Sequence, residues 1–139
     1  SRVENSMLAK VFAGDVMKKH ASGGVFVAED VAAEQARADA WETSPTGPIF
    51  GAKMRWAEGA AGEREAQLLA DSGLGREHLA KWKRIAPGTR RFVRVPVPEV
   101  ALSVSERTVR LDFTLPAGSY ATILVREILK RDAPLPKSG

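Results

Sequence analysis

Tyr120 stands in a stretch, residues 115–129, whose order predicts the end of a strand, a tight turn and then a helix. Apolar and polar residues alternate over 109–115, as in a strand with one buried face. Pro116 cannot donate to a ladder, Gly118 permits a sharp reversal, and Ser119 is a favoured helix N-cap. The strand before this turn and the helix after it would hold a ring at that position in a fixed direction. It could pack against a flat substrate, or it could be one more core aromatic.

A second candidate site is a basic run between residues 81 and 94, which contains no acidic residue. Its members are Lys81, Lys83, Arg84, Arg90, Arg91 and Arg94. Trp82 and Phe92 are interleaved with them, and cations mixed with aromatic rings suit a surface that follows RNA phosphates. The same run could be a solvated helix face followed by a charged edge strand.

The composition excludes several other kinds of chemistry. The chain has no cysteine, so it forms no disulfide and offers no thiolate. His20 and His78 are its only histidines, which makes a histidine-rich metal site improbable. No Ser-His-Asp arrangement, P-loop or pair of catalytic carboxylates emerges from the spacing. The composition therefore argues against a metal site.

The first part of the chain must position the basic run, and its pattern predicts mixed short strands and helices. Residues 3–12 have the spacing of the end of a helix. Residues 16–19 and 25–28 flank a Gly-Gly turn, which is typical of a hairpin. Helices are predicted over 31–41, 63–72 and 76–85, with a turn-rich loop over 43–51.

The character changes near residue 92, where we predict a domain boundary. Residues 92–97 and 100–104 alternate as strands, and a turn at 105–108 leads into the strand 109–115. Arg90 and Arg91 would then begin a strand that joins this hairpin, on the same side as Tyr120. The tail from residue 132 should be loose. The fold class is α+β: a mixed lobe over 1–91, then a hairpin and a final helix within 92–139.

Several motifs together resemble the TruD family of tRNA pseudouridine synthases. The string from Leu115 to Thr122 matches a C-terminal motif of that family. Further similarity lies in the segments 14–16, 22–26, 45–51 and 88–91, which follow the family's order at similar spacing. Each motif is weak alone, but together they span roughly residues 14 to 130.

The resemblance implies a role for each candidate residue. Tyr120 would pack against the target uracil, and Gly118, Ser119 and Arg126 would support that site. The basic run would hold tRNA. Residues 1–91 would be part of the family's insertion domain, and 92–139 the C-terminal piece of its catalytic domain. The family isomerises a uridine in the D-arm of tRNA without a cofactor.

The nucleophile is the main departure from the family pattern. That family carries its catalytic aspartate in a Gly-x-Lys-Asp motif, and the nearest string here ends in Met54. A thioether is neither a nucleophile nor a base in this chemistry. We therefore expect a fragment that is inactive alone, a monomer whose partners are tRNA and a missing N-terminal part of the same polypeptide.

Two alternatives stay open at this point. The chain could be a stand-alone, non-catalytic RNA-binding module that retains the insertion lobe, or an interaction fragment whose basic run only improves solubility. No apolar run is long enough to span a bilayer, and the N-terminus lacks the apolar block of a signal peptide. A cytoplasmic protein is the resulting expectation.

Overall fold

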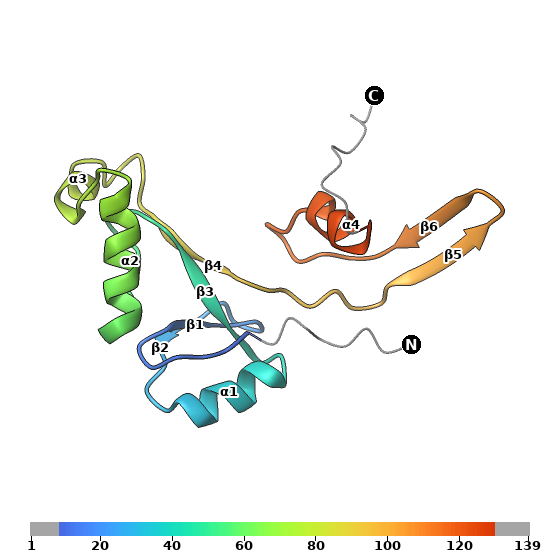
Figure 1. The fold of residues 1–139 in the computed structure, drawn as a ribbon, viewed down its shortest axis with the longest axis horizontal. Helices are drawn as coiled ribbons and strands as arrows, with labels where there is room; N and C mark the ends of the chain where they lie inside the picture. The colour runs from blue at the N-terminus through green and yellow to red at the C-terminus, as the bar shows by residue number, and fades with distance from the viewer. Residues whose placement is uncertain (1–8, 130–139) are drawn as a thin grey trace. The chain divides into compact units, whose positions relative to one another are not determined.

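The computed structural model describes residues 9–129 and has the mixed α+β character that the sequence predicts (Figure 1). The chain divides into two compact units between Arg94 and Val95. The beginning of the helix predicted over residues 3–12 and the tail from 132 lie outside the described residues. Residues 9–12 are not helical: the backbone N–H of Val11 donates to the side chain of Gln35, which in turn donates to the carbonyl of Ala9.

The first unit is built on a four-stranded antiparallel sheet with the order β2-β1-β3-β4. Its strands are β1 (Val16–Lys19), β2 (Val25–Val27), β3 (Thr43–Ile49) and β4 (Thr89–Phe92). Met17 is fully buried with Val11, Ala28 and Ala38, whereas its neighbour Val16 is buried with Ala57 and Ala61. Since adjacent residues of a strand face opposite sides, the two clusters lie on opposite faces of the sheet.

Helices cover these two faces. Helix α1 (Val31–Asp39) supplies Ala38 to the Met17 cluster, and the Asp30 carboxylate caps it by accepting from the N–H of Ala33 at 3.0 Å. Helix α2 (Gly59–Asp71) supplies Ala61 to the Val16 cluster. The short helix α3 (Arg76–Lys81) follows α2 and precedes β4.

Strand β3 was expected to be a loop because it contains two prolines and a glycine. It forms a strand because each half makes backbone hydrogen bonds to a neighbouring strand on one side only. Residues 43–45 pair with β1, and residues 46–49 pair with β4. Each half therefore resembles an edge strand, where the missing N–H of proline is tolerated. The backbone of Gly51 then passes so close to that of Gly88 that a Cβ on Gly51 would lie 2.1 Å from the Gly88 nitrogen.

The start of α2 also differs from the prediction, which began this helix at residue 63. The helix begins at Gly59 and includes Gly62. A Cβ at Gly62 would lie 2.5 Å from the carbonyl oxygen of Ala57, so glycine lets the helix pack tightly against the segment before it.

The second unit contains a hairpin and one helix, as the sequence predicts. Strands β5 (Ala101–Ser105) and β6 (Thr108–Asp112) pair with each other, and α4 (Ala121–Leu129) follows. The strand predicted over 92–97 is wrong: β4 ends at Phe92 and pairs with β3 in the first unit, not with the hairpin. None of residues 95–129 is buried, so the described part of this unit has no core of its own.

Candidate functional site

The turn before α4 presents Tyr120 to solvent. Gly118 has a φ of +85°, in the left-handed region that favours glycine, and the N–H of Ser119 donates to the carbonyl of Pro116 at 3.1 Å. The carbonyl of Tyr120 accepts from the N–H of Ile123 at 3.1 Å, so Tyr120 begins the hydrogen bonding of α4. The helix starts within two residues of Ser119, as predicted. Tyr120 is 64% exposed.

Arg126, the other predicted support residue, lies in the last turn of α4 and is exposed. With 3.6 residues per turn, residues 120 and 126 lie on different faces of the helix. The structure therefore does not bring Arg126 beside the ring of Tyr120. Gly118 and Ser119 do set the turn from which that ring projects.

The basic run is divided by the structure into exposed and buried members. Lys81 ends α3, and Lys83 and Arg84 follow it in a turn; all three are exposed. In β4 the alternation of a strand exposes Arg91 and buries Arg90. Arg94 is buried as well. Only Lys81, Lys83, Arg84 and Arg91 are thus placed where RNA phosphates could reach them.

Arg90 is held in a network that uses its whole guanidinium group. Its Nη1 donates to the Glu65 carboxylate at 2.7 Å, Nε donates to the Thr46 hydroxyl at 2.9 Å, and Nη2 donates to the Thr46 carbonyl at 2.9 Å. Glu65 is itself buried and accepts from the N–H of Ala57 at 3.2 Å. The expectation that Arg90 contacts RNA is therefore corrected: its charge joins β3, β4 and α2.

Arg94 has a similar structural role. Its Nη2 donates to the carbonyl of Ala38 in α1, and its guanidinium lies 4.2 Å from the centre of the Trp41 ring. Burial and these contacts separate Arg94 from the exposed members of the basic run. The sequence could not show this, because a buried and an exposed arginine look alike in a basic run.

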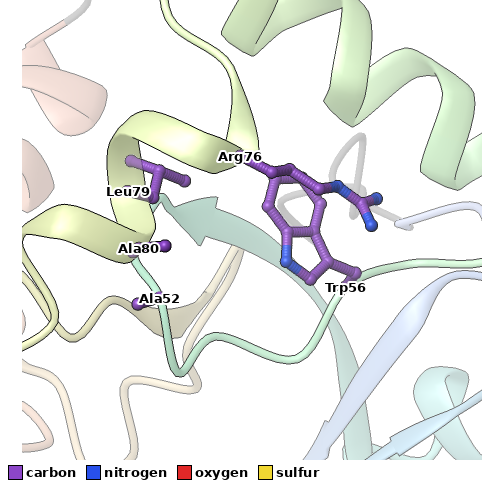
Figure 2. A pocket seen from close by; sticks show the side chains of 6 residues that line it. Ala52, Trp56, Arg76, Leu79 and Ala80 are labelled. Carbon is purple, nitrogen blue, oxygen red and sulfur yellow. The ribbon is translucent and has the colours of Figure 1, made fainter.

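A cavity of about 220 Å³ lies between α3 and the segment that follows β3 (Figure 2). The guanidinium of Arg76 stacks over the ring of Trp56 at 3.9 Å from its centre, and Ala52, Leu79 and Ala80 complete the wall. Sequence reasoning missed this arrangement, since Trp56 and Arg76 belong to no common motif.

Met54 lies in sequence between the cavity-lining residues Ala52 and Trp56, and it ends the string nearest to the resembled Gly-x-Lys-Asp motif. It is buried, and its N–H donates to the carbonyl of Gly51 at 3.2 Å. The Met54 side chain therefore packs in the interior and carries no acidic or basic group. No chemistry of bond cleavage can be assigned to it.

A second cavity, of about 330 Å³, lies where β1 and α1 end. It is lined by Lys19, His20, Ala21, Arg37, Trp41 and Glu42. Arg37 donates to Glu34 at 2.7 Å and to Glu42 at 3.3 Å, and the hydrogen bond to Glu34 is the main cause of its raised pKa. No helix among residues 9–129 is long and apolar enough to cross a membrane.

Comparisons with known proteins agree on one family. The sequence model of tRNA pseudouridine synthase D (TruD) matches residues 1–128. The chain is 45% identical to a tRNA pseudouridine synthase D of Anaeromyxobacter dehalogenans over 138 residues, which are 99% of this chain and 39% of that protein. It is 42% identical to a tRNA pseudouridine synthase D of Thermus thermophilus, over 95% of this chain and 36% of that protein.

A solved structure gives the same answer. The chain matches a crystal structure described as the putative tRNA pseudouridine synthase D of Methanosarcina mazei with a TM-score of 0.67 and 27% identity. The match covers 88% of this chain and 32% of that one. The chain thus spans well under half the length of the relatives it matches. On these matches, and on the turn that carries Tyr120, the chain belongs to the tRNA pseudouridine synthase D (TruD) family.

Proposed function

We propose that this chain is the C-terminal part of a cytoplasmic, monomeric tRNA pseudouridine synthase that isomerises a uridine in the D-arm. The observation that carries the proposal is the exposure of Tyr120 on a hydrogen-bonded glycine turn, in a unit where no described residue is buried. A two-stranded hairpin is stable only when it packs against a helix or further strands, and no described residue of this unit is buried, so we infer that further polypeptide covers it. The partial coverage of longer relatives supports the same proposal.

The exposed apolar side chains of the second unit indicate where that polypeptide would pack. Leu102, Val104 and Val109 of the hairpin are between 61% and 71% exposed. In α4, Ile123, Ile128 and Leu129 are each about half exposed. Exposed apolar residues in such density mark a contact surface. We assign the first unit to the insertion domain and the second to the catalytic domain, with their boundary after Arg94.

In the synthase, the residues of this chain would position the target base and would not themselves cleave the glycosidic bond. The target uridine would be extruded from its stack, as enzymes that act on buried bases require. Its base would then pack against the Tyr120 ring, whose direction is set by Gly118 and Ser119. The aspartate that attacks the nucleoside would come from polypeptide outside this chain, because Met54 offers no carboxylate.

Replacing Tyr120 tests its role directly. In the synthase extended to the length of its relatives, Tyr120→Ala should lower kcat/KM for pseudouridine formation about 5- to 150-fold, the range for losing one base-stacking contact. Tyr120→Phe keeps the ring face and should retain most of the activity. Thr122→Ala, an exposed neighbour in α4, is the matched control. Full activity in Tyr120→Ala would refute the base-packing role.

The exposed basic residues are proposed to bind tRNA phosphates. Replacing Lys81, Lys83 and Arg84 with alanine should reduce the slope of log K against log salt by about 2–3, since each lost phosphate contact removes about 0.7–0.9. A control triple at Lys10, Lys53 and Arg107, all exposed and outside the run, should leave the slope unchanged. Equal slopes for both triples, measured by filter binding, would show that the run does not contact the backbone.

A further inference from the structure

Three aromatic rings from separate parts of the first unit meet beside the second cavity. His20 stacks on Phe92 with centroids 4.5 Å apart and planes 11° apart, and the ring of Trp41 lies 6.3 Å from His20. A cation lies over each end: Lys18 Nζ is 4.9 Å from the centre of Phe92, and Arg94 is 4.2 Å from the centre of Trp41. We name these residues, Lys18, His20, Trp41, Phe92 and Arg94, the ring cluster.

The sheet explains why this cluster is only partly covered. Lys18 lies opposite Ser44 and Phe92 lies opposite Thr46, which places both on the face of Val16. Val16 is buried against Ala57 and Ala61, whereas Lys18 and Phe92, farther along that face, are half-buried. The ring cluster therefore begins where the cover by α2 ends.

Trp41 has a backbone that its residue type rarely adopts. Its φ is +62°, and it directly follows Ala40, the C-cap of α1. A glycine is favoured at that position because a Cβ is strained there. A tryptophan in its place keeps the strain and gains an indole beside His20 and over Arg94. Strained residues of this kind tend to occur at ligand sites.

Electrostatics leave the cluster cationic at its ends and neutral in its middle. Burial, and next the charge of Arg94, lower the pKa of His20, so its imidazole is neutral at neutral pH. Its Nε2 is covered and has no hydrogen-bond partner within residues 9–129, so stacking sets the ring's orientation. Arg37 engages both Glu34 and Glu42, so the positive charge of Lys19, which lines the same cavity, is not matched by those carboxylates.

We propose that the ring cluster and its cavity bind an unpaired nucleotide of RNA, separately from the basic run and from Tyr120. The base would stack on the Trp41–His20 side, within the cavity of about 330 Å³, and Lys19, which lines that cavity, would face its phosphate. Alternating rings and cations bind unpaired bases because every base has a π-face, and paired bases in a duplex do not present one. This inference rests on the proposed tRNA substrate.

Binding of two fluorescein-labelled RNA probes to the 139-residue chain tests the proposal. The probes are a single-stranded oligouridylate and a blunt RNA duplex of equal charge. Trp41→Leu should weaken binding of the single strand about 5- to 150-fold without changing the salt slope, and should leave duplex binding unaltered. Trp41→Phe should restore most of the loss.

Phe12 supplies the matched control. Lys10 and Arg64 lie over its ring, 5.4 Å and 5.1 Å from its centre, and it is 44% exposed. It does not line the cavity. Phe12→Leu should keep full affinity for both probes. Circular dichroism would show whether each variant is folded at the assay temperature.

Photo-crosslinking of the unaltered chain keeps the proposal testable if Trp41→Leu unfolds. An oligonucleotide with 4-thiouridine should crosslink to Trp41 or His20, as read by mass spectrometry. Unchanged single-strand affinity in folded Trp41→Leu, or crosslinks confined to other residues, would overturn the proposal. The proposed function would survive either outcome, because it is judged by pseudouridine formation in the Tyr120 variants.

Discussion

Replacing Arg90 with alanine should lower the free energy of unfolding of the first unit by about 3–5 kcal/mol, the cost of removing one partner of a buried ion pair. The change would leave Glu65 buried, with only the N–H of Ala57 donating to it at 3.2 Å. Thr46 would lose two hydrogen bonds from the guanidinium. Since domains have about 5–15 kcal/mol of stability, the loss is a large fraction of the total.

Urea unfolding followed by tryptophan fluorescence is suited to this measurement. Trp41, Trp56 and Trp82 all lie in the first unit, so the signal reports that unit alone. Arg91→Ala is the matched control, because Arg91 is the adjacent, exposed residue of β4 and should change stability by no more than about 0.5 kcal/mol.

A double variant separates the charge from the packing. Arg90→Met with Glu65→Leu replaces the pair by apolar groups, and such replacements are often neutral or stabilising. It should therefore recover much of the stability that Arg90→Ala loses. If Arg90→Ala unfolded at the same urea concentration as the unaltered chain but bound tRNA more weakly, the structural role of Arg90 would be wrong.

Local signals account for the parts of the fold that the sequence predicted. The Gly-Gly turn after β1, the Asp30 cap of α1, and the Pro116–Gly118 turn before α4 each act within a few residues. The hairpin of β5 and β6 has a regular alternation that needs no distant partner to be recognised. Such features can be predicted because their causes lie in the same short segment.

The errors arose where a distant partner decides the outcome. Pro45 and Pro48 indicated a loop, but β1 and β4 each pair with one half of that segment. Arg90 and Arg91 are neighbours of one type, and the alternation of β4 together with the distant Glu65 and Thr46 assigns Arg90 to the interior. The ring cluster joins three parts of the chain and has no local sequence pattern.

The candidate site was predicted in part for the same reason. The turn that exposes Tyr120 is local, and the family motif around it is a contiguous string. The division of the basic run depends on the alternation of β4 and on the packing of Arg94 against α1. Neither the alternation nor the packing can be read from the amino-acid composition.

The 139-residue chain by itself should form no pseudouridine, even with saturating tRNA. Cleaving the glycosidic bond requires an oriented nucleophile, and orientation contributes about 7–11 kcal/mol in favourable cases. Met54, which ends the string nearest to the family's Gly-x-Lys-Asp motif, is buried and has no carboxylate. A surface acid such as Asp112, which pairs with Arg110 at 3.0 Å, lacks that orientation.

Pseudouridine formation in tRNA, measured for the chain alone and for the same chain extended at its N-terminus to the length of its relatives, is the most direct test. We expect no product from the chain and conversion of one D-arm uridine by the extended protein, with Tyr120→Ala reducing that conversion. Product formed by the purified chain and abolished by Asp112→Asn would contradict the account, and so would an extended, folded protein that leaves every uridine unchanged.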